Sequence, residues 1–333
     1  MTAQLPEPMI AVALPVRNGA NYLALALDSI LAQTMGDFTL HVSDNASDDA
    51  TPDILADYAR RDPRVRVSRS PELIPQAANV NRGVRLTGSA WVKLFCHDDI
   101  MREDCLAALV QAIGSLEHSG VALIGNGEQH LFGNGYLTDP PAETGFLQLS
   151  GRDTIARKLW DVSRAVPFPA LTTATVRRDA FEKVGGFDPR YLYFDLFCWL
   201  ELLTHYDYAV VPAPLTINRI HAGQVAVQAR ASLRELQDFR AFLPEFVARH
   251  GAELGIDARA RMRLRLIPAA LGARGIAGEL AAGRGGRALR SFTNMPIAYW
   301  PVLPPLVLRA WRQERVKMAA LGAHVPAELL YPV

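Results

Sequence analysis

The stretch WVKLFCHDDI, residues 91–100, places two acidic residues directly after a short apolar run. Trp91–Phe95 has the pattern of a buried strand, and Asp98 and Asp99 follow its end. Adjacent carboxylates repel each other and lose hydration at the mouth of a sheet, so a compensating group is required. A divalent cation that carries a phosphorylated ligand is the simplest such group. The alternative is that Asp99 only caps a helix that starts near Arg102.

Apolar runs alternate with helical stripes on either side of this stretch. Strands are predicted at residues 9–14, 38–42, 65–68, 91–95 and 121–125, and helices at residues 21–34, 77–86 and 102–118. This alternation predicts an α/β fold with a mostly parallel sheet flanked by helices. Ligands bind such sheets beyond the carboxyl ends of the strands, where three polar clusters fall: PVRNGAN (15–21), SDNASDD (43–49) and CHDD (96–99).

The composition changes near Ala226, where Arg, Ala and Leu become dominant and the polar clusters stop. We therefore predict a sheet domain at residues 1–225 and a helical C-terminal region of three or four helices at residues 226–333. The chain of 333 residues is long enough for one large domain or two modest ones.

Charge and cysteine content limit the classes of function and the compartment. The net charge of +1 argues against nucleic acid as the main partner. Cys96, Cys105 and Cys198 lack metal-site spacing and an even count, which indicates reduced thiols in a cytosolic protein. The N-terminus lacks the pattern of a signal peptide, and no apolar run reaches the roughly 18 residues of a membrane span. A cytoplasmic location is therefore expected.

Six segments, in order, resemble the N-terminal domain of the family 2 glycosyltransferases, inverting enzymes with the Rossmann-like GT-A fold. They are VALPVRNGANYLALALDSILAQT (12–34), LHVSDNASDDAT (40–51), NRGVRLTGSAWVKLFCHDD (81–99), VRRDAFEKVGGFD (176–188), FDLFCWLELL (194–203) and RIHAGQ (219–224). The resemblance covers roughly residues 9–225 and is greatest to bacterial rhamnosyl- and related transferases that build surface polysaccharides of the cell envelope, such as O-antigen.

The resemblance implies that the turn after the first strand contacts the nucleotide through Pro15, Val16 and Asn18. Arg17 could reach the diphosphate. Ordinary turn chemistry explains the types of Pro15 and Asn18 equally well. Asp44, one residue beyond the second strand, can accept the imide hydrogen of uracil or thymine, which favours a UDP- or dTDP-sugar donor.

Further ligand contacts are implied by the same resemblance. Asn81 lies where the family makes base or ribose contacts. Asp98 approaches the ribose or the metal, and Asp99 coordinates Mg²⁺ or Mn²⁺, which prefer hard oxygen ligands. His221 is placed near the metal or the diphosphate, with a structural hydrogen bond as the alternative, and Arg219 could pair with the diphosphate.

The acidic pattern before the pair is shorter than the fuller pattern of the family. Cys96 and His97 occupy the places where further acids would stand. His97 could be a ligand or could hydrogen-bond the loop backbone. With fewer carboxylates, the metal is expected to bind mainly together with the nucleotide.

Asp195 is the candidate catalytic base. An inverting transfer needs one carboxylate that takes a proton from the attacking hydroxyl. The family has an acidic pair at the start of this helix, and here the pair reads Phe194-Asp195. A helix N-terminus favours the ionised form, although an N-cap would explain Asp195 as well. Glu201, the rival base, lies about 240° around the helix, so both cannot face one site; Asp188 is interpreted as a turn or cap acid.

The tail carries an apolar, aromatic and Pro-rich stretch, Met295–Leu308, before four cations: Arg309, Arg312, Arg315 and Lys317. This pattern suits a peripheral contact with the inner face of the cytoplasmic membrane. The alternative is a helix that packs on the catalytic domain or on a second subunit of a homodimer. The acceptor implied by the resemblance is a glycan or a polyprenyl-linked glycan.

These residues together predict a metal-assisted inverting glycosyltransferase. A sugar nucleotidyltransferase would want a Gly-rich, basic stretch after the first strand, and PVRNGAN has one Gly and one Arg. A catalytically inactive protein that binds sugar nucleotides or glycans is the other alternative, because one acid is missing at Phe194.

Overall fold

The chain folds into two compact units. The computed structural model describes residues 7–116, 119–140, 145–160, 168–221, 224, 234–258, 261, 264, 266–281, 283–293, 295 and 299–321. The first unit contains Met1–His130, Thr138–Ile155 and Val166–Arg219, and the second contains Leu131–Leu137, Ala156–Ala165 and Ile220–Val333. The prediction that two domains meet at residue 225 stays a prediction.

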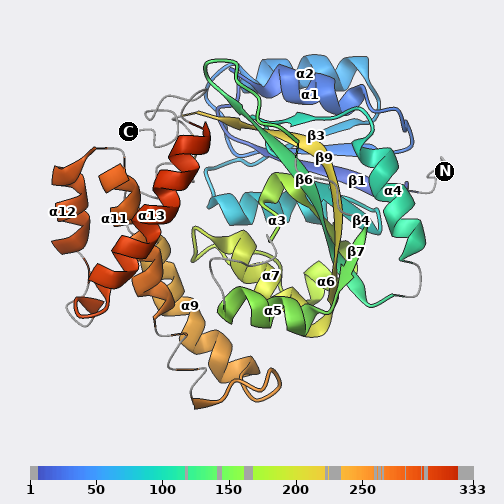
Figure 1. The fold of residues 1–333 in the computed structure, drawn as a ribbon. Helices are drawn as coiled ribbons and strands as arrows, with labels where there is room; N and C mark the ends of the chain where they lie inside the picture. Colours follow the sequence, from blue (N-terminus) through green and yellow to red (C-terminus); the bar gives the residue numbers. More distant parts are fainter. Residues whose placement is uncertain are drawn as a thin grey trace. The chain divides into compact units, whose positions relative to one another are not determined.

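A nine-stranded sheet forms the frame of the first unit, with the order β3-β2-β1-β4-β8-β6-β9-β5 and with β7 beside β9 (Figure 1). The strands are β1 (Ile10–Val16), β2 (Thr39–Asp44), β3 (Val65–Arg69), β4 (Trp91–Leu94), β5 (Ile100–Met101), β6 (Val121–Phe132), β7 (Leu147–Leu149), β8 (Ala174–Arg177) and β9 (Asp207–Ile220).

The predicted mostly parallel arrangement holds for five of these strands. β3, β2, β1 and β4 pair in parallel, and β8 pairs antiparallel with both β4 and β6, so β6 runs in the direction of β4. The carboxyl ends of β1, β2 and β4 therefore lie at one edge of the sheet, together with that of β6. This edge holds the polar clusters of the sequence.

Helices cover both faces of this sheet. They are α1 (Leu23–Leu31), α2 (Thr51–Arg61), α3 (Gln76–Arg85), α4 (Cys105–Ser115), α5 (Gly151–Trp160), α6 (Arg178–Lys183) and α7 (Phe194–His205). α1 and α2 lie on one side and α3 and α7 on the other (Figure 1). The apolar stripe of α1 (Leu23, Leu27 and Ile30) is buried in one core with the side chains of β1 and β2, as its spacing predicts.

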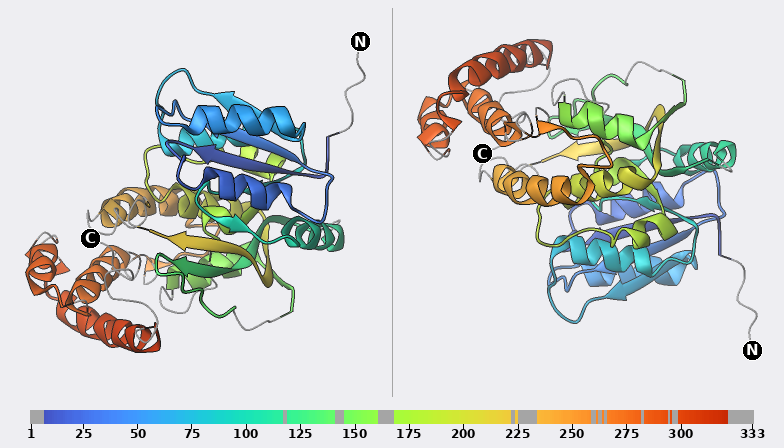
Figure 2. Two further views of the ribbon diagram at one scale, coloured as in Figure 1. Left: turned by 90° about the horizontal axis from the view of Figure 1, so that it is seen from above. Right: turned by 90° about the horizontal axis from the view of Figure 1, so that it is seen from below.

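The second unit is helical, and its described helices are α9 (Arg234–His250), α11 (Ile267–Ala281), α12 (Gly285–Thr293) and α13 (Leu303–Leu321). α12 and α13 both pack on α11, as two further views show (Figure 2). Their core contains Ala273, Ile276, Ala288, Met295 and Leu303. The predicted α/β fold with a helical C-terminal region is thus confirmed. Among the described residues, no helix is long and apolar enough to span a bilayer.

Candidate active site

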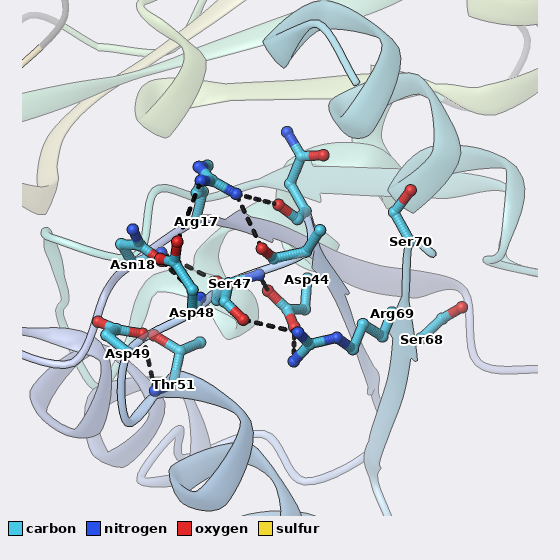
Figure 3. A network of polar contacts seen from close by, with 12 residues as sticks. Arg17, Asn18, Asp44, Ser47, Asp48, Asp49, Thr51, Ser68, Arg69 and Ser70 are labelled. Carbon is cyan, nitrogen blue, oxygen red and sulfur yellow. Dashed lines mark hydrogen bonds and ion pairs between the residues drawn. The ribbon is translucent and has the colours of Figure 1, made fainter. Parts of the chain in front are cut away.

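The turns after β1 and β2 are joined by hydrogen bonds into one structure (Figure 3). The Arg17 guanidinium donates to the carbonyl groups of Asn45 (3.0 Å) and Ala46 (2.8 Å). The backbone N–H of Asn18 donates to the Ser47 hydroxyl at 2.9 Å. Asn18 has a φ of 50°, a conformation that asparagine adopts more readily than most residues. Arg17 thus supports the loop, and its contact with a diphosphate stays a prediction.

Pro15 does not end the first strand, contrary to the sequence prediction. β1 runs from Ile10 to Val16, and Pro15 and Val16 are both buried within it. Proline removes an N–H donor but keeps its carbonyl group. The ladder continues past it because the N–H of Asn45 donates to the carbonyl of Val16 at 2.9 Å. The loop that follows therefore begins two residues later than predicted.

Asp44 is the last residue of β2 and does not lie one residue beyond it, contrary to the sequence prediction, because the strand stays paired with β1 and β3 up to this position. Its side chain is only 1% exposed, and the fold provides partners for both carboxylate oxygens. Oδ1 accepts the Ser47 N–H at 3.1 Å, and Oδ2 lies 3.2 Å from a nitrogen of Arg69. Arg69 also donates to the Ser47 carbonyl at 2.6 Å (Figure 3). A carboxylate has about four lone-pair sites, so Asp44 keeps the capacity to accept an imide hydrogen.

Asn81 joins α3 to the turn that precedes α7. Its amide nitrogen donates to the Phe187 carbonyl at 2.7 Å, and its amide oxygen accepts the Phe187 N–H at 2.9 Å. A side chain at Gly186, which has a φ of 71°, would approach the same amide oxygen to 2.8 Å. These contacts give Asn81 a structural role, and its contact with base or ribose stays a prediction.

The acid pair follows β4 and does not cap α4, which begins at Cys105 without a side-chain cap. Oδ1 of Asp99 instead accepts the backbone N–H of Arg219, at the end of β9, at 2.9 Å. Asp99 is 2% exposed, and burial together with the neighbouring Asp98 raises its pKa to about 7. The alternative that Asp99 only caps this helix is therefore wrong. Burial and the neighbouring carboxylate disfavour the ionised form of Asp99, as expected for adjacent carboxylates at the mouth of a sheet.

Cys96 stands beside the pair, and potential ligand atoms of Cys96, Asp98 and Asp99 all lie within 4.8 Å of one another. Burial and these two acids, with Asp195 after them, raise the pKa of the Cys96 thiol well above its usual range. A protonated thiol is a poor ligand for Mg²⁺ or Mn²⁺, whereas the two carboxylates suit either ion. The donor set therefore fits an ion that takes its remaining oxygen ligands from a diphosphate.

His97 packs against the turn after β1. A Cβ atom at Gly19 would lie 2.6 Å from Cδ2 of the His97 ring, so only glycine leaves room for it. This contact connects the loop of the acid pair with the turn after β1, and it does not place His97 among the candidate ligands.

Arg219 is held between the acid pair and an aromatic ring. Its Nε donates to the Asp98 carbonyl at 3.1 Å, and its guanidinium lies 5.0 Å from the centre of the Tyr22 ring. Such cation–π contacts fix the direction of a guanidinium. His221 directly follows β9 and belongs to the second unit; its contact with metal or diphosphate stays a prediction.

Asp195 lies in the first turn of α7, as predicted, and is half-buried. Burial of its carboxyl group raises its pKa to about 6, although the N–H of Leu196 donates to it at 2.8 Å. A carboxylate with this pKa is a stronger base than an exposed one and is still mostly ionised at neutral pH.

Phe194 and Asp188 have structural roles near the base. The Phe194 ring packs edge-on against Phe187 at 5.1 Å, so the position where the family has a first acid belongs here to the core. Asp188 accepts the N–H of Arg190 at 2.9 Å and forms an ion pair with its guanidinium, which confirms it as a turn acid.

Residues 11–185 match the model of the family described as Glycosyl transferase family 2, more than half of the chain. The chain belongs to glycosyl transferase family 2. An uncharacterised glycosyltransferase of Rickettsia prowazekii is 24% identical over 249 residues, 72% of each chain. A PGL/p-HBAD biosynthesis glycosyltransferase of Mycobacterium bovis is 37% identical over 117 residues, which cover 34% of this chain and 45% of that protein.

Solved structures support the GT-A fold of this family 2 glycosyltransferase. A mannosyltransferase of Pyrobaculum calidifontis, in complex with GDP-Man and Mn²⁺, superposes with a TM-score of 0.54 at 18% identity over 98% of this chain and 88% of its own. TarS 1–349 of S. aureus with UDP-GlcNAc gives a TM-score of 0.54 at 13% identity over 94% and 92%. At these identities the likeness shows the fold alone.

Three residues near the site of this family 2 glycosyltransferase are not predicted from the sequence. Arg69 and Tyr22 are reached only through tertiary contacts, and no local pattern singles them out. Lys93 carries a detectable signal, because it is a charged residue inside the apolar run WVKLF. A buried charge of this kind is rare without a function or a partner.

Proposed function

We propose that this family 2 glycosyltransferase is a metal-assisted inverting enzyme. It moves a sugar from a UDP- or dTDP-sugar to a hydroxyl of a glycan or polyprenyl-linked glycan acceptor. The observation that carries the proposal is the buried acid pair after β4, where potential ligand atoms of Cys96, Asp98 and Asp99 lie within 4.8 Å of one another. Asp195, at the start of α7, lies near enough to raise the pKa of the same Cys96 thiol, which supports a base in the neighbourhood of the leaving-group site.

Asp195 is the base in this mechanism. It accepts the proton of the acceptor hydroxyl while the oxygen forms a bond to the anomeric carbon, on the face opposite the leaving group. The bond from the anomeric carbon to the diphosphate oxygen breaks, and the nucleoside diphosphate leaves with the electron pair. The product has the inverted configuration. The raised pKa of Asp195, about 6, suits a base that works near neutral pH.

The donor nucleotide binds along the ends of β1, β2 and β4. Asp44 accepts the imide hydrogen of the base, and Asp98 contacts the ribose. Further nucleotide contacts are assigned to Pro15, Val16, Arg17, Asn18, Asn81 and Arg219. Support comes from the burial of Asp44 and the hydrogen-bonded turns around it, which leave a preformed, rigid edge.

Asp99, with Asp98, would hold the Mg²⁺ or Mn²⁺ ion, and the contribution expected of His221 stays a prediction. When bound, such an ion neutralises the charge that develops on the leaving diphosphate. The Arg219 N–H that donates to Asp99 fixes one of its carboxylate oxygens. Because the protein supplies few ligands of its own, the ion is held mainly together with the nucleotide.

The experiment that tests the proposal offers the protein of 333 residues a panel of UDP-, dTDP- and GDP-sugars with Mn²⁺ and measures the released nucleotide. Release of UDP or dTDP supports it. Pyrophosphate release from UTP and a sugar phosphate would indicate the nucleotidyltransferase, and binding without release would indicate the inactive binder. The anomeric configuration of the product, read by NMR, decides whether the transfer is inverting.

We also propose a peripheral contact between the second unit and the inner face of the cytoplasmic membrane. Its support is the pairing of exposed apolar residues with basic ones: Leu289 and Leu308 are 64% and 48% exposed, and Arg309 and Arg312 follow Leu308. Leu308→Gln should reduce flotation with anionic liposomes and leave the buried core, which includes Leu303, intact. Unchanged flotation contradicts the contact and favours packing against a second subunit.

A further inference from the structure

Lys93 is a buried cation that the proposed reaction does not use. It is the third residue of β4, and its side chain has no exposed surface. Among the described residues, no other lysine or arginine is buried. Burial of an ammonium group costs several kcal/mol, and an apolar side chain of similar volume would fill the same space. The charge therefore calls for an explanation other than packing.

Two short hydrogen bonds hold the ammonium group. Nζ of Lys93 donates to Oδ1 of Asn126, on β6, and to the carbonyl of Thr172, in the 3-10 turn Leu171–Thr173 before β8, each at 2.7 Å. Burial lowers the pKa of Lys93 to about 8, and the nearby Cys105, Cys96, Glu128 and Asp99 oppose this shift. Lys93 therefore stays largely protonated at neutral pH.

Thr172, one of these two partners, also lies beside the acid pair. The carbonyl group of Thr172 is bound to Lys93, and its hydroxyl group lies close enough to the Asp99 carboxylate to lower the pKa of Asp99. The hydroxyl makes no hydrogen bond of ordinary geometry to the described residues. The position of this turn, which Lys93 holds, thus sets how the hydroxyl faces Asp99.

The other partner leads to the same place through β9. Nδ2 of Asn126 donates to the Thr216 hydroxyl at 3.2 Å. Three residues further along β9, Arg219 donates its N–H to Asp99 at 2.9 Å and its Nε to the Asp98 carbonyl at 3.1 Å. Both segments on which the acid pair depends are therefore connected to Lys93.

We propose that Lys93 is a positioning residue for the acid pair. By holding Asn126 and Thr172, it sets the turn before β8 and the strand β9 against the loop of Asp98 and Asp99. The pair then keeps the geometry that a divalent cation with a nucleoside diphosphate requires. Lys93 contacts no substrate itself, and the inference rests on the proposed function of the acid pair.

The test is the substitution Lys93→Met. The matched control is Lys183→Met, which makes the same chemical change at a lysine whose Nζ lies 5.7 Å from the centre of the Tyr206 ring. Mn²⁺ binding in the presence of UDP is measured by electron paramagnetic resonance of the free ion, without any turnover. Loss of a residue that orients metal ligands typically lowers the affinity for the metal about tenfold or more. We expect this loss for Lys93→Met, unchanged binding of UDP without metal, and wild-type values for Lys183→Met.

Thr216→Val provides the second variant and keeps Lys93 in place. It removes the hydroxyl that receives Asn126, and we expect a smaller weakening of Mn²⁺ binding in the same direction. If Lys93→Met has the circular-dichroism spectrum of the wild type and binds Mn²⁺ equally well, the inference is overturned while the proposed function stands. If Lys93→Met does not fold, unchanged Mn²⁺ binding by Thr216→Val overturns it instead. If the wild type binds no Mn²⁺ with UDP, both fall.

Discussion

Two carboxylates at the same edge of the sheet are almost equally buried, yet their surroundings differ. Asp44 receives a backbone N–H and the Arg69 guanidinium, so the fold itself satisfies it. Asp99 receives one backbone N–H, faces Asp98, and has no ion-pair partner among the residues that the structure describes; its pKa rises to about 7. The proposed base-reading half, around Asp44, is thus preformed, whereas the proposed reacting half, around Asp98, Asp99 and Asp195, is completed by what binds there.

The largest expected effect falls on the reacting half. Asp195→Asn should lower kcat about 10²- to 10⁴-fold, because the acceptor proton then has no base. The affinity for UDP should stay at the wild-type value, since the nucleotide half is untouched. Glu201→Gln, on the same helix, is the matched control and should keep near-normal kcat. Full turnover by Asp195→Asn, or its loss in Glu201→Gln alone, would transfer the role to Glu201.

Asp99→Asn should separate catalysis from stability. Mn²⁺-dependent turnover should fall about 10- to 100-fold, as for other weakened metal sites. The pKa of Asp99 is raised in the folded state, so the ionised carboxylate destabilises the fold. The full stability is present below about pH 4, where Asp99 is protonated in both states, and part of it is lost as the pH rises through about 7. Asp99→Asn should therefore have a higher Tm than the wild type at pH 8, and the difference should vanish near pH 4. A lower Tm at pH 8 would contradict this view of the pair.

The pH profile gives a third way to examine the reacting half. Because burial raises the pKa of Asp195 to about 6, kcat should fall about tenfold per pH unit below that value. The measurement is made between pH 5 and 8 with saturating donor and Mn²⁺. A variant of the other half, Asp44→Asn, should show the same profile at a lower donor affinity. A flat profile would exclude a carboxylate of this pKa as the base.

Asp44→Asn should have the smallest effect on kcat and the opposite effect on stability. The change removes the negative charge that faces the half-exposed Arg69. It also replaces one carboxylate oxygen, an acceptor, by an NH₂ group, which is a donor, next to the Arg69 guanidinium. The free energy of unfolding should fall by about 1–3 kcal/mol, a typical cost for a buried hydrogen-bonding group that loses its partner. The KM for the donor should rise while kcat changes little. Equal stability of Asp44→Asn and the wild type in urea unfolding would remove the contrast between the halves.

The sequence predicts well what depends on local pattern. Apolar runs predict the strands β1–β4, and the spacing of Leu23, Leu27 and Ile30 predicts α1. The places of Asp99 beyond a strand end and of Asp195 at a helix start follow from the alternation of elements, and Asp44 is found at the end of β2 itself. A local pattern is sufficient because parallel strands present their carboxyl ends at one edge.

Other features depend on contacts between distant segments and leave no local pattern. The antiparallel direction of β8 between β4 and β6 cannot be predicted from its four residues, ATVR. The Phe194 ring occupies the place of an acid because the Phe187 ring, seven positions earlier, packs against it. The amide of Asn81 is bound to Phe187, 106 residues away in the chain. Only the fold shows that these residues support the site.

The contrast between the halves is tested most directly by thermal unfolding with UDP and Mn²⁺, separately and together. A ligand that binds only the folded protein raises its stability, and the rise is larger the tighter the binding. Because the edge proposed to bind the nucleotide is preformed and the protein supplies few metal ligands of its own, UDP alone should raise the Tm and Mn²⁺ alone should hardly change it. Both together should raise it by more than the sum of the separate shifts. A full Mn²⁺ effect without UDP, or shifts that simply add, would contradict an ion that is held together with the nucleotide.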